Sequence, residues 1–155
     1  MTAIRVRFVD TFLLRGAGPT LEVLVLRRGP QGRNPGSWET VHGTIEAGET
    51  PVRASLREVR EETGLVPERV YNLSRVEGFY QQATDELALI PAFAAFVARD
   101  AEPQLSTEHD AYAWLAPREA AARFAWPRER RALDDILSMV GEGGGGLLDD
   151  VLRVC

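Results

Sequence analysis

Acidic residues crowd into the segment from Gly43 to Leu65. Five of its side chains are carboxylates: Glu46, Glu49, Glu58, Glu61 and Glu62. If the segment is helical, the last three share one surface, where like charges one turn apart destabilise the helix. A hard divalent cation removes this repulsion, and sites made of carboxylate oxygens suit Mg²⁺ or Mn²⁺. The spacing therefore predicts a metal site built on Glu58, Glu61 and Glu62.

The second half of this segment predicts one amphipathic helix. Thr50 can cap the first turn through its hydroxyl, and Pro51 fits the first helical position. Gly64 is a suitable stop because glycine accepts the left-handed conformation past a helix end. Apolar groups recur at helical spacing and predict a stripe that faces a core: Val52, Leu56, Val59 and the methyl group of Thr63. The acidic side chains would then lie on the flank and back of this stripe. The alternative is a solvated charged face of the helix with ion pairs such as Arg57–Glu61.

The whole segment resembles the Nudix box, G-x5-E-x7-R-E-U-x-E-E-x-G-U, in which U is an aliphatic residue. The chain matches it at every fixed position, from Gly43 through Glu49 and Arg57 to Leu65. A pattern of this length is far more specific than a lone glycine motif. The resemblance implies a Nudix hydrolase with an α/β/α sandwich and a mixed sheet. It also implies Mg²⁺ (or Mn²⁺) as cofactor and hydrolysis of a nucleoside diphosphate linked to another group.

Hydrophobic periodicity predicts strands before and after the helix. The expected strands cover residues 4–14, 21–28, 38–42, 70–82 and 87–97, and the first two suggest a hairpin. Gly43 to Glu49 is expected to be a loop. This order predicts a mixed α/β domain, with helices covering both faces of a sheet.

The end of the chain predicts further helices. A short alanine-rich helix opens at residues 115–119, and a longer one runs from Trp126-Pro127 to about Val140. Residues 141–146 are glycine-rich and predict a flexible break, followed by a short terminal helix or a disordered tail. We expect residues 1–155 to form a single domain, with residues 141–155 as a flexible tail.

Composition restricts the partners of the chain. Its 155 residues are 45% hydrophobic and 26% charged, which is ordinary for a globular protein. A net charge of −5 gives no basic field that would attract nucleic acid. No apolar run approaches membrane-spanning length and the first residues lack a signal-peptide core, so we expect a cytoplasmic location and no membrane partner. A small nucleotide-type molecule is the expected partner, and a homodimer is left open.

The cysteine and lysine content excludes several kinds of site. Cys155 is the only cysteine, which excludes a disulfide and a cysteine-based zinc site. The chain has no lysine, so all 18 basic residues are arginine. Any cationic contact to a phosphate must therefore come from arginine, which can grip it in a bidentate fork.

The segment from Ser106 to Ile136 resembles the dihydroneopterin triphosphate/nucleoside triphosphate pyrophosphohydrolase branch of the family. In that branch a Glu-His pair precedes an aromatic-x-Trp-Leu strand, as Glu108 and His109 do here. The resemblance implies that Glu108 supplies a fourth carboxylate to the metal cluster, the alternative being a surface glutamate. His109 is either a proton carrier or substrate contact, or an ordinary loop histidine.

The residues just before the box read Val41-His42-Gly43, where many relatives read P-G-G and this branch favours V-T-G. In the family, the carbonyl that precedes the box glycine is a metal ligand, so the resemblance assigns this role to the backbone of His42. We expect Glu61 to complete the cluster, or to act with Glu58 or Glu108 as general base. Arg57 is expected to pair with Glu49 and orient it.

Residues outside the box address the substrate. ADP-ribose pyrophosphatases tend to carry a proline shortly after the box, but this chain has Tyr80 there, which argues against ADP-ribose. A tyrosine at this distance occurs in diadenosine polyphosphate hydrolases, so that alternative stays open. Arg27 and Arg28 resemble the paired arginines of the family and could hold phosphate. Trp38 or Tyr80 could stack on a flat base or pterin.

We therefore expect a nucleoside or pterin triphosphate to be cleaved to monophosphate and pyrophosphate. The rival from another class is a Nudix-fold regulator that binds a nucleotide without hydrolysing it. Such proteins usually lose box carboxylates, and here all of them are present.

Overall fold

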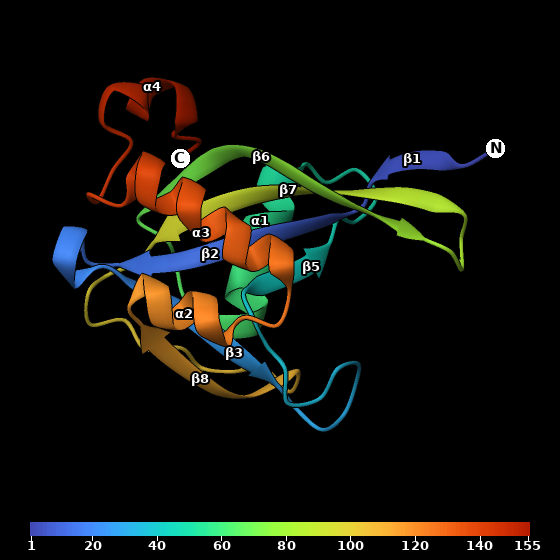
Figure 1. Cartoon of the computed structure of the whole chain (residues 1–155), viewed down its shortest axis with the longest axis horizontal. Coiled ribbons are helices and arrows are strands. Elements are labelled where there is room, and N and C mark those ends of the chain that lie inside the picture. Colours follow the sequence, from blue (N-terminus) through green and yellow to red (C-terminus); the bar gives the residue numbers. More distant parts are fainter.

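The computed structural model describes residues 1–155 as one mixed β-sheet between two helical layers (Figure 1). The strands are β1 (Ala3–Val6), β2 (Phe8–Arg15), β3 (Glu22–Arg28), β4 (Trp38–Glu39), β5 (Val41–Thr44), β6 (Arg69–Gln81), β7 (Glu86–Phe96) and β8 (His109–Leu115). The helices are α1 (Pro51–Thr63), α2 (Pro117–Arg123), α3 (Pro127–Val140) and α4 (Asp149–Leu152), with 3-10 turns at Gly18–Thr20 and Gly146–Leu148. No helix combines the length and apolar character needed to cross a membrane.

Strand β2 lies at the centre of the sheet. It runs parallel to β7 and antiparallel to β3 and β5. Strands β1 and β6 also pair with β7, and β4 and β8 pair with β3. Because β1 and β2 are parallel to β7 while the other pairs are antiparallel, the sheet is mixed, as the sequence predicts.

Alternate residues of β2 belong to two hydrophobic cores on opposite faces of the sheet. Phe12 and Leu14 pack with residues of α2 and α3 such as Ile136. Leu13 packs on the other face with Val59 of α1. This alternation follows from the two-residue period of a strand. In Figure 1, α2 and α3 lie in front of the sheet and α1 lies behind it, which confirms the expected α/β/α sandwich.

The first two predicted strands require one correction. The predicted hairpin is present, with Leu14 opposite Val23 in β2 and β3. The stretch from residue 4 to 14, however, is interrupted at Arg7, where it divides into β1 and β2. The two pieces pair with successive parts of β7: β1 with residues 86–89 and β2 with residues 92–96.

The loop expected from Gly43 to Glu49 starts later than predicted. Strand β5 continues through Thr44 because Gly43 pairs with Val9 and Thr44 pairs with Phe8. The connection to α1 is therefore short, and the box glycine lies inside the sheet.

Helix α1 begins and ends where the sequence predicts. The hydroxyl of Thr50 accepts a hydrogen bond from the backbone N–H of Arg53 at 3.3 Å, and Pro51 is the first helical residue. Gly64 follows the helix with φ 68°, in the left-handed region that glycine accepts without strain. Val59 and Thr63 of the predicted stripe are buried.

Strand β6 changes character at Ser74, which has φ 51° and lies within a register shift between Asn72 and Val76. Tyr71 and Leu73, before the shift, are buried in the core. The five residues from 77 to 81, beyond it, are half-buried or exposed.

The end of the chain packs against the first part of β6. The backbone N–H of Val154 donates to the carbonyl of Val70 at 2.9 Å. Tyr71 donates its hydroxyl to Asp149 at 2.7 Å, and Leu152 is buried. The short terminal helix among the expected alternatives is thus present as α4.

Candidate active site

The carboxylate of Glu58 lies directly on the backbone of Gly43. A Cβ atom placed on Gly43 would stand only 2.0 Å from Cδ of Glu58. Gly43 has no positive φ, so its backbone does not require glycine. The absence of a side chain serves instead to seat the Glu58 carboxylate between α1 and β5.

Arg57 holds the carboxylates that surround Glu58. Its Nε and Nη2 donate to the two oxygens of Glu49 at 2.9 and 3.0 Å. Its Nη1 donates to Glu58 at 2.8 Å and to Glu61 at 3.2 Å. Nη2 also donates to the carbonyl of Thr44 at 2.8 Å. The hydrogen bond to Glu49 is the largest cause that raises the pKa of Arg57, so this side chain stays cationic. The structure thus contains the pairing of Arg57 with Glu49 that the sequence suggested.

Glu62 is buried, although the helical spacing placed it on the flank and back of the apolar stripe. It is 3% exposed, and its Oε2 has no hydrogen-bond partner. Burial raises the pKa of Glu62 well above its ordinary value, and the carboxylates of Glu108 and Glu58 add to the effect. Burial also raises the pKa of Glu58, against the lowering effect of Arg57. Buried charges are normally paired or bound to a metal, but Arg57 pairs with Glu58 and not with Glu62, so Glu62 has no ion-pair partner among the side chains of the protein.

Glu108 and His109 join this cluster from the start of β8. Glu62, Glu108 and His109 each offer a ligand atom, and these atoms lie within 4.8 Å of one another. Glu108 is exposed, whereas His109 is buried. Nε2 of His109 lies 2.9 Å from Oε1 of Glu39, and its Nδ1 has no partner. The structure therefore brings together three of the predicted carboxylates, Glu58, Glu62 and Glu108. Glu61 remains at the exposed edge beside Arg57.

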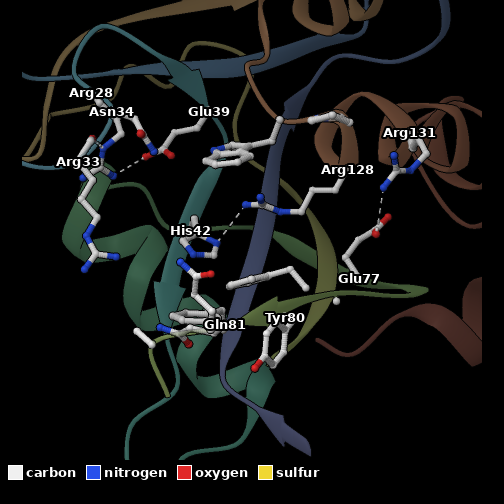
Figure 2. A pocket seen from close by; sticks show the side chains of 17 residues that line it. Arg28, Arg33, Asn34, Glu39, His42, Glu77, Tyr80, Gln81, Arg128 and Arg131 are labelled. Atoms are coloured by element: carbon white, nitrogen blue, oxygen red, sulfur yellow. Dashed lines mark hydrogen bonds and ion pairs between the residues drawn. The ribbon is translucent and has the colours of Figure 1, made fainter. Parts of the chain in front are cut away.

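A cavity of about 910 Å³ is lined by Glu39, the residue that contacts His109 of the carboxylate cluster (Figure 2). The side chain of His42 points into it, and its Nδ1 lies 2.7 Å from Oδ1 of the buried Asp10. Arg128 donates its Nε to the other oxygen of Asp10 at 2.7 Å. Burial acts to raise the pKa of Asp10, but the hydrogen bond with His42 and the charge of Arg128 outweigh it and lower the pKa. An ionised Asp10 thus fixes both side chains in the wall of the cavity.

Three aromatic rings form a stack in this wall, with Phe8 between His42 and Phe79. Phe8 stacks on His42 with ring centroids 5.2 Å apart and an interplanar angle of 28°. Phe79 stacks on Phe8 at 5.9 Å and 22°. Tyr80 and Trp126 also line the cavity. Such a wall suits the face of a flat heteroaromatic ring.

Arginines line the cavity around these rings. Arg28 and Arg33 lie beside Glu39 at one end, while Arg128 faces His42 (Figure 2). Nη1 of Arg28 donates to Oε1 of Glu39 at 2.9 Å, the same oxygen that Nε2 of His109 approaches. Glu39 therefore joins this end of the cavity to the carboxylate cluster.

Glu129 of α3 fixes the strands that carry Glu39 and His42. Its Oε2 accepts a hydrogen bond at 2.5 Å from the backbone N–H of Thr40, the residue between β4 and β5. The side chain is fully buried. Burial, with the nearby charge of Asp10, raises the pKa of Glu129 to about 8.

The structure separates the four residues expected to bind substrate. Arg28 and Tyr80 line the cavity, but Arg27 and Trp38 do not. Arg27 donates to Asp110 at 2.7 Å, and Trp38 packs against the core beside α2. Arg27 and Trp38 are opposite each other in β3 and β4, and the pairing of β3 with β8 shifts its register between Arg27 and Arg28. The two arginines are therefore not equivalent positions of one regular strand, and of the two Arg28 alone lines the cavity.

Sequence reasoning missed several residues of the site, namely Asp10, Glu39, Arg128 and Glu129. Glu39 could have been noticed only as an acidic residue within a short strand close to the box. Asp10 and Arg128 stand in segments that show only strand and helix periodicity.

A model of the NUDIX domain family matches residues 5–136. An octanoyltransferase of Myxococcus xanthus is 36% identical over 110 residues, which cover 70% of this chain and 30% of that protein. The Mus musculus bis(5'-nucleosyl)-tetraphosphatase [asymmetrical] is 34% identical over 88 residues, covering 54% of this chain and 58% of that protein. The chain thus spans less than two thirds of either relative.

Among solved structures, the Escherichia coli dihydroneopterin triphosphate pyrophosphohydrolase superposes with a TM-score of 0.66 at 24% identity. The superposition covers 89% of this chain and 99% of that one. At this identity the likeness shows a shared fold.

Proposed function

Because this chain belongs to the Nudix family, we propose that it is a metal-dependent pyrophosphohydrolase acting on a small nucleotide-type substrate. The observation that carries the proposal is Glu62. This carboxylate is buried, has an unpaired oxygen and is surrounded by other carboxylates. A protein gains nothing in stability from such an arrangement, so a positively charged ligand is its natural complement.

The residues fit a Mg²⁺ or Mn²⁺ ion held by Glu58, Glu62 and Glu108, with Glu61 and the His42 carbonyl as further ligands. Two observations support this assignment. The orphaned Glu62 oxygen needs a partner, and Gly43 leaves room for the Glu58 carboxylate at the place where it is needed. When bound, the ion supplies a positive charge that stabilises charge developing on phosphate oxygens.

The chain's own residues position the reacting groups. Arg57 holds Glu58 and Glu49 through hydrogen bonds of 2.8 to 3.0 Å. The Glu58 carboxylate is therefore preorganised to bind the ion. Glu61 is exposed and held only at the long 3.2 Å distance by Arg57, which suits it to take a proton from an attacking water. Glu58 or Glu108 is the alternative base.

The cavity supports a substrate with a flat ring and a phosphate chain. We assign the ring to the wall formed by Phe8 and His42, next to Tyr80. We assign the phosphates to Arg28 and Arg33, at the end of the cavity where Glu39 contacts both Arg28 and His109. A nucleoside or pterin triphosphate placed in this way would be cleaved to the monophosphate and pyrophosphate.

A dinucleoside polyphosphate is the second candidate. Two observations favour it: the relative from Mus musculus is a bis(5'-nucleosyl)-tetraphosphatase, and Tyr80 lines the cavity. A cavity of about 910 Å³ is at the upper end of the usual range for small-molecule sites, so a larger ligand also fits.

The test is a panel of nucleoside triphosphates, dihydroneopterin triphosphate and dinucleoside polyphosphates, each assayed with Mg²⁺ and with Mn²⁺. A triphosphate should release orthophosphate only after inorganic pyrophosphatase is added. Direct release of orthophosphate would refute the assignment, and cleavage of dinucleoside polyphosphates alone would establish the second candidate.

The metal dependence is tested on the same substrates. EDTA should abolish hydrolysis, and added Mg²⁺ or Mn²⁺ should restore it. Glu62→Gln should lose several orders of magnitude in turnover while its thermal unfolding stays cooperative. Full activity without metal, or nucleotide binding with no turnover at all, would overturn the proposal.

A further inference from the structure

We propose that Nδ1 of His109 is a nitrogen ligand of the divalent ion, and that Glu39 holds the imidazole in position for this role. The inference rests on the proposed function, because it adds a ligand to the metal site assigned above. It goes beyond a site made of oxygen donors alone.

His109 is built into the structure as a buried group with one free nitrogen. The residue is 4% exposed and its side chain 0% exposed. Nε2 lies 2.9 Å from Oε1 of Glu39, which also accepts a hydrogen bond from Arg28 at 2.9 Å. An ionised carboxylate only accepts hydrogen bonds, so the network assigns the proton to Nε2. In the neutral imidazole this leaves a lone pair on Nδ1.

His109 belongs to the same cluster as Glu62, and Nδ1 is the ring nitrogen whose lone pair is free to bind an ion. Nδ1 of His109 and Oε2 of Glu62 are both buried and both without a hydrogen-bond partner. Ligand atoms of Glu62, Glu108 and His109 lie within 4.8 Å of one another. Two ligands of one ion, each at about 2.1 to 2.2 Å from it, are at most about 4.4 Å apart. A small movement of the exposed Glu108 side chain would bring its oxygen from within 4.8 Å to the shorter separation that one shared ion requires.

One shared ion explains both unpaired atoms. Leaving two buried polar atoms without partners costs about 1–3 kcal/mol each, so two such atoms on residues of one cluster call for a common ligand. Glu39 then has the place of the carboxylate that commonly fixes the tautomer and ring orientation of a metal-binding histidine. Arg28, which lines the substrate cavity, contacts the same oxygen of Glu39 and so helps to fix the position of His109.

A mixed nitrogen and oxygen donor set changes the expected metal preference. Mg²⁺ prefers oxygen ligands, whereas imidazole suits transition metals. The site should therefore favour Mn²⁺ or Co²⁺ over Mg²⁺ more strongly than a site of carboxylates does.

The test is pulsed EPR of the full chain loaded with Mn²⁺, which detects magnetic coupling to a coordinated nitrogen nucleus. The chain contains two histidines, so one matched substitution assigns the signal. We expect imidazole ¹⁴N coupling in the unsubstituted protein and in His42→Gln, whose backbone carbonyl is retained, and its loss in His109→Gln. Labelling the unsubstituted chain with ¹⁵N-histidine should convert the ¹⁴N pattern to a ¹⁵N pattern, and this arm is independent of any effect of substitution on folding.

Metal affinity gives a second readout. His109→Gln should weaken Mn²⁺ binding by about 10- to 100-fold and Mg²⁺ binding by less, and Glu39→Gln should weaken Mn²⁺ binding in the same direction.

Two results would overturn the inference while leaving the proposed function intact: Mn²⁺ bound without histidine coupling in an active enzyme, or coupling that survives in His109→Gln. Coupling that disappears in His42→Gln instead would assign the nitrogen ligand to His42 in β5 and also refute the inference. Absence of both Mn²⁺ binding and hydrolysis would refute the proposed function itself.

Discussion

Replacing Gly43 with alanine tests the idea that the glycine exists to seat the Glu58 carboxylate. The residue lies in β5 without a positive φ, so its backbone accepts alanine. The new Cβ, however, would stand 2.0 Å from Cδ, 2.2 Å from Cγ and 2.3 Å from Oε1 of Glu58. All three contacts are with the Glu58 side chain, which we propose as a metal ligand.

The size of the effect follows from these distances. Moving Cδ of Glu58 from 2.0 Å to an ordinary contact of 3.4 Å displaces the carboxylate by at least 1.4 Å. A misplacement of about 1 Å in an enzyme site can cost about 100-fold in rate. We therefore expect kcat/KM to fall by about 100-fold or more, which corresponds to about 2.7 kcal/mol. The displacement also breaks the 2.8 Å hydrogen bond from Arg57 to Glu58.

The assay compares Gly43→Ala, Glu58→Ala and the double variant for hydrolysis, Mn²⁺ affinity and free energy of unfolding. In the otherwise unsubstituted chain, overpacking by Gly43→Ala should lower the free energy of unfolding by about 1–3 kcal/mol. In the Glu58→Ala background the methyl group meets no carboxylate, and the same substitution should be close to neutral.

Gly144→Ala is the matched control, because Gly144 has no positive φ, lies outside the cavity, and its added Cβ would stand at an ordinary contact of 3.5 Å from the hydroxyl of Tyr71. Full activity of Gly43→Ala, or an equal loss of stability in both backgrounds, would refute the reasoning.

Three further predictions concern other parts of the site. Glu108→Ala should reduce turnover far more than Glu102→Ala, which removes only an exposed partner of Arg15 and Tyr112; equal effects would place Glu108 outside the site. Glu129 holds its proton up to about pH 8 when folded but releases it near 4.5 when unfolded, so the free energy of unfolding should fall as pH rises between these values. The loss approaches about 5 kcal/mol at most. Glu129→Gln should lack this dependence on pH. The same pH dependence of the free energy of unfolding in both proteins, measured by urea titration, would contradict the prediction. Arg57→Lys keeps the charge but loses the fork on Glu49, so kcat should drop at least about 10-fold with little change in KM, and an unchanged kcat would argue against a positioning role.

Local patterns in the sequence were enough to predict the helix that carries the carboxylate cluster. The hydroxyl of Thr50, the ring of Pro51 and the freedom of Gly64 each act within one turn of the helix end. The strand pattern also predicted the mixed sheet between helices. These features depend on neighbours in the chain, so periodicity reveals them.

Contacts between distant segments were beyond such patterns. Arg128 and Asp10 are 118 residues apart, and His109 and Glu39 are 70 apart. Their partnership depends on which strands pair and in which register, and one sequence contains no signal for that. Glu62 shows the same limit, because the width of the buried face of α1 depends on the sheet that covers the helix. The place of Glu108 beside Glu62 was anticipated only through resemblance to a family.

The irregularity in β6 at Ser74 divides this strand into two parts of unequal protection. Before it, Tyr71 and Leu73 are each 1% exposed and sit in the core, and the end of the chain covers them. After it, residues 77–81 line the cavity without a buried side chain. Amide protons of the first part should exchange with deuterium only on global unfolding, and those of the second part by local opening. A nucleotide that binds in the cavity should slow exchange in the second part and leave the first part unchanged. The deuterium uptake of one strand would thereby report occupancy of the site and integrity of the fold as separate signals.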